Sequence, residues 1–159
     1  MNIVIIGSGG REHALCYKLL KSSKINKIYC IPGNAGTDEI ATNIFADIND
    51  FDEIYKIVLK LNVELIVVGP EIPLVNGIVD YFEKKNIKIF GPNKKCSQLE
   101  GSKFFMKNIC KKYNIPSAKY FEISDINQIE KFLSSVSFPV VVKSDGLAAG
   151  KGVTICNNL

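Results

Sequence analysis

Short, mainly apolar segments alternate with longer amphipathic ones over the first 92 residues, and this alternation leaves few folds open to the chain. The apolar segments span residues 2–6, 25–31, 64–68 and 87–90, and each has the length of a β-strand. Strands that are apolar on both faces and separated by helices are typical of a parallel sheet covered by helices on both sides. The sequence therefore predicts a doubly wound α/β domain that ends near residue 92.

Three helices are predicted between these strands, over residues 11–23, 50–62 and 73–86. In the second of them apolar residues recur three and four positions apart, and Asp50 is placed to cap its first turn. Pro73 opens the third, because the first turn of a helix tolerates a missing backbone N–H. Each helix thus returns the chain to the start of the next parallel strand.

The pattern changes after residue 92. Helix is predicted in two pieces over residues 94–114, around Gly101 and Ser102, and Pro116 then marks a boundary. The elements expected beyond it are a strand at 119–123, a helix at 125–136, and strands at 139–143 and 153–156. About 40 residues are too few to enclose a hydrophobic core. We therefore expect an N-terminal domain over 1–100, a helical linker over 101–117 and the truncated start of a second domain over 118–159.

The charge of the chain argues against a nucleic-acid partner. The formal net charge is +4, but Arg11 is the only arginine among 20 Lys and Arg, and the lysines are spread over the whole chain. Arginine supplies most bidentate contacts to bases and phosphates, and no basic patch is visible in the pattern. No run of 18 apolar residues occurs, and the N-terminus lacks the basic start of a signal peptide, so no membrane partner is expected.

Five cysteines and one histidine also limit the chemistry. The cysteines are odd in number and no two form a Cys-x-x-Cys pair, so a zinc site is not expected. Free thiols are typical of a reducing compartment. We therefore expect a cytoplasmic protein.

A glycine-rich loop follows the first strand, with the sequence Gly-Ser-Gly-Gly-Arg-Glu-His over residues 7–13. Glycines allow a sharp turn, and the free N–H groups of the following helix attract an anion. A dinucleotide fingerprint needs glycine where Glu12 stands, and an acidic residue after the second strand, which ends instead in Pro-Gly-Asn. The loop therefore predicts a site for a phosphate or a phosphorylated sugar, or else a turn that only packs helix on sheet.

Three titratable residues lie near this predicted site. Arg11 lies in the first helical turn, where a cation opposes the helix dipole unless an anion pairs with it; the alternative is a solvated charge. Glu71 follows the strand at 64–68, at the same sheet edge, where it would hold a substrate hydroxyl or amine, or else be an acid that the helix dipole favours. His13 is expected to be a structural hydrogen bonder rather than a catalyst.

A second glycine-rich segment spans residues 143–153, between two predicted strands. It differs from a P-loop, because its glycine spacing is one residue short, Gly152 replaces the Ser or Thr that binds magnesium, and a strand rather than a helix follows. A flexible loop with Lys143 at its base and Lys151 at its tip suits a lid over the phosphates of a nucleotide. The alternative is a mobile surface hairpin.

Six segments, in order, resemble the phosphoribosylamine–glycine ligase (glycinamide ribonucleotide synthetase) family of the ATP-grasp superfamily. They are residues 5–14, 32–37, 68–75, 90–92, 99–103 and 145–153. The resemblance covers essentially the whole chain and implies a Rossmann-like, pre-ATP-grasp domain followed by the incomplete start of an ATP-grasp domain. It implies that ATP phosphorylates the carboxylate of glycine, and that the amine of 5-phosphoribosylamine then displaces the phosphate to give glycinamide ribonucleotide.

The resemblance also implies roles for individual residues. Gly9, Gly10 and Arg11 would bind the substrate phosphate. Asn34 and Glu71 would lie near the sugar and the amine. The residues implied to bind ATP are Lys103, Lys143, Gly146, Gly150, Lys151 and Gly152.

Magnesium or manganese is the implied metal beside ATP, and its acidic ligands, like the glycine site and most catalytic groups, are expected beyond residue 159. We therefore expect the chain to be an N-terminal fragment that is inactive alone. Two alternatives stay open. One is another ATP-grasp carboxylate–amine ligase, and the other is a phosphate-ligand-binding module without catalysis.

Overall fold

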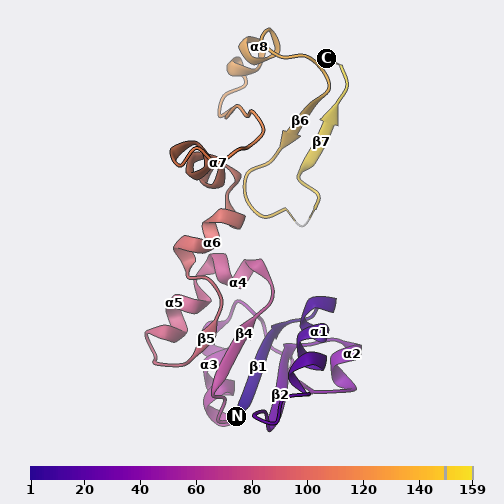
Figure 1. Ribbon diagram of the computed structural model, residues 1–159, viewed down its shortest axis with the longest axis vertical. Helices are drawn as coiled ribbons and strands as arrows, with labels where there is room; N and C mark the ends of the chain where they lie inside the picture. The colour runs from indigo at the N-terminus through magenta and orange to yellow at the C-terminus, as the bar shows by residue number, and fades with distance from the viewer. Residues whose placement is uncertain (149, 159) are drawn as a thin grey trace. The chain divides into compact units, whose positions relative to one another are not determined.

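The computed structural model describes residues 1–148 and 150–158 of the chain (Figure 1). They form two compact units, Met1–Ser97 and Gln98–Leu159. Residues 101–117, which the sequence predicts as a helical linker, belong to the second of these units.

The first unit contains a five-stranded sheet in the order β3-β2-β1-β4-β5, and every neighbouring pair of strands is parallel. The strands are β1 (Asn2–Gly7), β2 (Lys27–Pro32), β3 (Thr42–Asn43), β4 (Leu65–Val68) and β5 (Ile89–Phe90). The strand order reverses at β1, so the crevice in which such sheets bind ligands lies at the carboxyl ends of β1 and β4. The predicted doubly wound parallel sheet is confirmed.

Helices cover both faces of this sheet (Figure 1). The even-numbered residues of β1 pack with buried side chains of α3 (Phe51–Lys60) and α5 (Ile78–Glu83). The odd-numbered isoleucines of β1 point the other way and pack with Cys16 of α1 (Gly10–Leu19). Because both faces of β1 are buried, its residues from Ile3 to Ile6 are all apolar, and this is the pattern that predicts a strand of a covered parallel sheet.

Two helices differ from their predicted bounds. The helix expected at 73–86 is divided into α4 (Glu71–Asn76) and α5, because Gly77 adopts a left-handed φ of +96° that ends the first helix. The helix expected at 11–23 ends at Leu19.

The capping prediction for α3 is confirmed, since the Asp50 carboxylate accepts the backbone N–H of Glu53 at 2.9 Å. Two short elements, β3 and the helix α2 (Ala35–Asp38), are not predicted from the sequence. With two and four residues they are too short to show a hydrophobic period.

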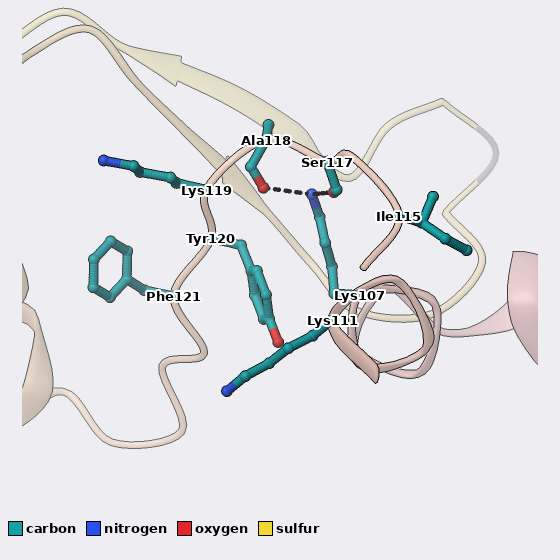
Figure 2. Close-up of a pocket in the computed structure, with 8 residues that line it drawn as sticks. All are labelled: Lys107, Lys111, Ile115, Ser117, Ala118, Lys119, Tyr120 and Phe121. Carbon is teal, nitrogen blue, oxygen red and sulfur yellow. Dashed lines mark hydrogen bonds between the residues drawn. The ribbon is translucent and has the colours of Figure 1, made fainter. Parts of the chain in front are cut away.

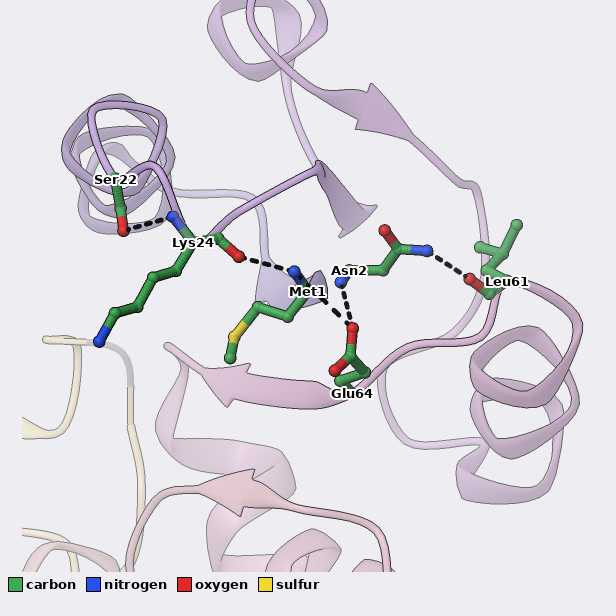
Figure 3. Close-up of polar contacts among 6 residues, drawn as sticks. All are labelled: Met1, Asn2, Ser22, Lys24, Leu61 and Glu64. Carbon is green, nitrogen blue, oxygen red and sulfur yellow. Dashed lines mark hydrogen bonds and ion pairs between the residues drawn. The ribbon is translucent and has the colours of Figure 1, made fainter.

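Polar contacts close the amino edge of the sheet (Figure 3). The α-amino group of Met1 donates to the carbonyl of Lys24 at 2.6 Å and pairs with Glu64 at 3.7 Å. The Asn2 side chain donates to the carbonyl of Leu61 at 2.9 Å. These contacts join the start of β1 to the segments that precede β2 and β4, and the glycine-rich loop after β1 lies at the opposite, carboxyl edge of the sheet.

The second unit holds the helices and the hairpin of the C-terminal part. They are α7 (Lys103–Lys112), α8 (Asn127–Leu133), β6 (Val140–Lys143) and β7 (Val153–Cys156). The helix α6 (Lys94–Gly101) begins in the first unit and ends in the second, because the division falls after Ser97. The predicted break at Gly101 and Ser102 is confirmed, and β6 and β7 form an antiparallel hairpin around the second glycine-rich loop.

The strand predicted at 119–123 is wrong, because the described part of this unit offers it no neighbouring strand: β6 pairs with β7 there. The preceding residues are instead held on α7, where the ammonium of Lys107 donates to Ser117 Oγ and to the carbonyl of Ala118 (Figure 2). Tyr120 donates its hydroxyl proton to Asn108 of the same helix at 3.2 Å. A shallow cavity of about 370 Å³ lies between α7 and this segment.

The hairpin carries apolar side chains on open faces. Val141, Val142, Val153 and Ile155 are 50% to 64% exposed. Within the described part of this unit, neither α7 nor α8 contributes a fully buried residue. Such a two-stranded sheet gains little from the hydrophobic effect by itself.

Candidate functional site

A cavity of about 410 Å³ opens at the carboxyl ends of β1 and β4, where the strand order reverses. Residues 7–12, which follow β1, line it together with Pro70 and Glu71, which follow β4, and with Ile48. The volume lies within the range typical of small-molecule sites. The structure thus brings four of the five predicted substrate residues to one cavity, namely Gly9, Gly10, Arg11 and Glu71.

The loop after β1 turns directly into α1. Gly7 has a φ of +126°, in the region that only glycine adopts without strain, and α1 begins at Gly10. The exposed residues Ser8, Gly9 and Gly10 place the first turn of this helix at the cavity. A helix start carries unsatisfied N–H groups and a partial positive charge, so this wall of the cavity favours an anion.

The guanidinium of Arg11 reaches across to the loop after β4. Its Nη1 donates to the carbonyl of Gly69 at 2.5 Å, and Nη1 and Nη2 both donate to Glu71 Oε1 at 3.2 Å. The two side chains are 62% and 44% exposed, so the ion pair contributes about 1 kcal/mol or less to stability. The contact orients both side chains at the rim, and the guanidinium has further N–H donors for an anion.

Asn34, the fifth predicted substrate residue, lies behind the loop and holds its backbone. The side-chain amide donates to the carbonyls of Ser8 at 2.8 Å and Gly9 at 3.3 Å. Its Oδ1 accepts the backbone N–H of Thr37 at 2.9 Å and so caps α2. The predicted contact of Asn34 with a sugar or an amine stays a prediction, whereas its support of the loop is observed.

A buried hydroxyl fixes Asn34 in turn. Thr37 is fully buried, and its Oγ1 accepts the backbone N–H of Asn34 at 2.7 Å. The same hydroxyl lies 2.8 Å from Asn43 Oδ1, to which it donates. Asn43 belongs to β3 and donates to the carbonyl of Asn34 at 2.8 Å. The strand that the sequence does not reveal therefore anchors the loop.

The imidazole of His13 packs over Gly36, where a side chain would meet it at 2.7 Å. His13 does not line the cavity. Its packing on Gly36 is observed, whereas its predicted role as a structural hydrogen bonder stays a prediction.

In the second unit, the start of α7 is tied to the hairpin loop. The Asp145 carboxylate accepts the backbone N–H of Lys103 at 2.6 Å and the hydroxyl of Ser102 at 3.0 Å. The ammonium of Lys103 donates to the carbonyl of Gly146 at 2.8 Å. Lys103, predicted to bind ATP, therefore lies against the loop that is predicted to cover the phosphates.

The sequence alone predicts no individual role for Asp145, which in the structure caps α7. Desolvation is the largest single influence on its carboxyl and raises the pKa, but the hydrogen bonds from Lys103, Ser102 and nearby backbone amides together lower the pKa below its ordinary value of 3.8. An acid 42 residues after the start of a helix gives no sequence signal that it caps that helix.

The remaining ATP-site predictions fall on the hairpin loop. Lys143 at the end of β6 and Lys151 are both exposed. Gly146 and Gly150 have positive φ angles of +86° and +77°, which glycine adopts freely. Gly152 has no room for a side chain, because one would lie 2.2 Å from Ser144 Oγ. Ala149, within the predicted lid, lies outside the described residues.

The cysteines are free thiols. Cys16 and Cys30 are buried with their sulfur atoms 3.1 Å apart, and desolvation raises the pKa of both, that of Cys30 to about 12. Over residues 1–148 and 150–158, no three His, Cys, Asp or Glu side chains lie close enough together to hold a metal ion. No helix in that part of the chain is long and apolar enough to cross a membrane.

Comparison with known proteins gives matches to both units. Residues 1–100 match the family described as "Phosphoribosylglycinamide synthetase, N domain", and residues 101–159 match "Phosphoribosylglycinamide synthetase, ATP-grasp (A) domain". The chain is 46% identical over 158 residues to a phosphoribosylamine–glycine ligase of Clostridium acetobutylicum, covering 99% of the chain and 38% of that protein. It is 44% identical over 155 residues to the corresponding ligase of Caldanaerobacter subterraneus, covering 98% of the chain and 37% of that protein.

A solved structure is similar as well. The crystal structure of phosphoribosylamine–glycine ligase from Thermotoga maritima superposes with a TM-score of 0.76 at 33% identity, covering 99% of the chain and 36% of that protein. The chain therefore spans a little over a third of the length of the relatives it matches.

Proposed function

Because the chain belongs to the phosphoribosylglycinamide synthetase family, we propose that it forms the phosphoribosylamine-binding part, and the start of the ATP-grasp part, of an ATP-dependent ligase. This ligase joins glycine to 5-phosphoribosylamine and gives glycinamide ribonucleotide. The observation that carries the proposal is the cavity at the carboxyl ends of β1 and β4, where the glycine-rich loop, a helix start and Arg11 meet.

The proposed reaction has two steps. The carboxylate of glycine attacks the γ-phosphorus of ATP, forming glycyl phosphate and releasing ADP. The amine of phosphoribosylamine then attacks the acyl carbon, the bond to the phosphate oxygen breaks, and inorganic phosphate leaves with the electron pair. A free carboxylate resists amines because it has no good leaving group, so the protein must position the reactants, neutralise charge and keep water from the acyl phosphate.

The proposed substrate-binding roles are based on the positions of the residues at the cavity. Gly9, Gly10 and Arg11 bind the phosphate of the substrate, since a helix start and a guanidinium converge there. Glu71 lies at the rim, within reach of a sugar hydroxyl or an amine. Asn34 keeps the loop in the shape that presents these groups.

The ATP-binding roles rest on the second unit. Lys103 is held beside the hairpin loop, and Lys143 lies at the end of the strand that enters it. The loop residues proposed to cover the nucleotide phosphates are Gly146, Gly150, Lys151 and Gly152. A divalent metal, Mg²⁺ or Mn²⁺, would neutralise phosphate charge when bound, with ligands outside the described residues. The domains are proposed to be 1–100 and 118–159, joined by 101–117, and the free thiols support a cytoplasmic location.

Binding of ribose 5-phosphate tests the substrate site, because this molecule carries the phosphate and sugar of the proposed substrate. We expect titration calorimetry with the chain to show saturable binding, and Arg11→Ala to weaken it about tenfold or more through loss of charge-assisted hydrogen bonds.

Lys18→Ala is the matched control, since it removes one exposed positive charge from the other end of α1. It should leave affinity within about twofold, because exposed charges further apart than a Debye length are screened. Equal loss in both variants would mean that only net charge matters and that the cavity is not the site.

A further inference from the structure

Glu12 stands where a dinucleotide-binding loop has its third glycine. In that loop, Gly-x-Gly-x-x-Gly, the second glycine lets the backbone approach a pyrophosphate and the third lets the helix pack closely on the strand. Gly7 and Gly9 occupy the first two positions here, but the third is a glutamate. Glu12 is only 4% exposed although it borders the cavity. A charged side chain is rarely buried unless it has a specific partner, and Glu12 has one.

The carboxylate of Glu12 binds the loop backbone. Its Oε2 accepts the N–H of Gly9 at 2.6 Å, so this amide is already used when a ligand arrives. In a dinucleotide-binding loop the backbone at the corresponding glycine closely approaches the pyrophosphate. Glu12 therefore replaces an anion-binding donor of the loop with a negative charge of its own.

The same side chain fills the space between the two strands at which the order reverses. A Cβ at Gly69, after β4, would lie 1.9 Å from Glu12 Oε1, and a Cβ at Gly7, the end of β1, would lie 2.7 Å from Glu12 Cδ. Both positions are glycine because the glutamate occupies the volume that their side chains would need. The carboxylate of Glu12 thus fills the space between the ends of β1 and β4 at the wall of the cavity.

We propose that Glu12 is a specificity-determining residue that restricts this cavity to ligands with a single terminal phosphate and excludes pyrophosphates, including those of dinucleotides. The inference rests on the proposed function, which places one phosphate at Gly9, Gly10 and Arg11. Gly9 has no side chain and so lets the phosphate approach closely, while its own amide is held by Glu12. The helix start and Arg11 offset the charge of one phosphate group. A second group meets the carboxylate of Glu12 and finds the Gly9 amide occupied.

The test compares ribose 5-phosphate with inorganic pyrophosphate as ligands of the chain, by titration calorimetry at fixed ionic strength without divalent metal. We expect the wild-type chain to bind pyrophosphate at least about tenfold more weakly than ribose 5-phosphate. Glu12→Gln keeps the shape and removes the charge, so it should raise the affinity for pyrophosphate relative to ribose 5-phosphate by about tenfold. Glu39→Gln, the same change on an exposed residue, should leave that ratio unchanged.

The outcomes separate this inference from the proposed function. If the wild-type chain binds neither ligand, the proposed function is wrong and the inference falls with it. If the wild-type chain binds ribose 5-phosphate and pyrophosphate equally well, the proposed role of Glu12 is wrong while the proposed function stands. This comparison uses the wild-type chain only, so it does not depend on whether a variant folds. An unchanged ratio in a folded Glu12→Gln variant, with the fold checked by circular dichroism, would also overturn the inference.

Discussion

Thr37→Val is expected to destabilise the first unit, because the buried Thr37 hydroxyl bonds two parts of the loop region. It accepts the backbone N–H of Asn34 at 2.7 Å and donates to Asn43 Oδ1 at 2.8 Å. Valine has nearly the shape of threonine but leaves both groups without their partner. Asn34 and Asn43 are only partly buried, so each group left without a partner costs about 1–2 kcal/mol, and the loss is about 2–4 kcal/mol in total. That is a large fraction of the stability of about 5–15 kcal/mol usual for a domain.

Thr37→Ser is the matched control for this prediction. It keeps the hydroxyl and removes one methyl group, which costs about 1 kcal/mol. The two variants therefore separate the hydrogen bonds of the side chain from its packing.

Native-state amide hydrogen exchange of β1 and β2 measures the effect in the first unit itself. Core amides exchange through global opening, so a loss of 2–4 kcal/mol speeds their exchange by about 30- to 1,000-fold, and a loss of 1 kcal/mol by about fivefold. If the valine and serine variants exchange at the same rate, the hydroxyl contributes no net stability and the reasoning is refuted.

Two further predictions concern the contacts beside the loops. Gly69→Ala is expected to lower the free energy of unfolding, measured by urea denaturation, by about 1–3 kcal/mol, because its Cβ would lie 1.9 Å from Glu12 Oε1. Adding Glu12→Ala removes the clash and should recover part of that loss. If the effects of the two substitutions simply add, the clash is contradicted. Asp145→Asn is expected to speed amide exchange at the start of α7 at neutral pH. Because hydrogen bonds lower the pKa of Asp145, its stabilising effect should be complete above pH 3.8 and lost as the pH falls through the lower, folded value. The NMR shift of the Lys103 amide follows this change, and a shift that moves only above pH 3.8 would contradict it.

The fold of the first unit follows from local pattern. A strand buried on both faces has a nearly continuous run of apolar residues, and a helix that covers it has apolar residues along one face. These two patterns make the parallel sheet and most of its helices predictable from the sequence. The break at Gly77 and the strand β3 are not, because a left-handed glycine and a two-residue strand leave no period to detect. The strand expected at 119–123 fails for the opposite reason, since a β-pattern needs a neighbour with which to pair.

Residue types and spacing also located the candidate site. A glycine-rich turn between a buried strand and a helix indicates anion binding wherever it occurs, and the carboxyl ends of parallel strands always meet at one edge. Gly9, Gly10, Arg11 and Glu71 line one cavity for that reason. The alternation of strands and helices along the chain predicts the parallel topology of the sheet, and that topology brings the loops that carry these residues to one edge.

The partners of the polar side chains were decided by the tertiary structure alone. Asn34 holds the backbone of Ser8 across 26 positions, Arg11 meets Glu71 across 60, and Asp145 caps α7 across 42. A hydrogen bond depends on a few tenths of an ångström and on direction, and no periodic pattern encodes such a match between distant segments. The periodic pattern of apolar residues and the glycine-rich loop therefore predict where in the fold the site lies. The packed structure decides which of the polar side chains are held by other residues and which can bind a ligand.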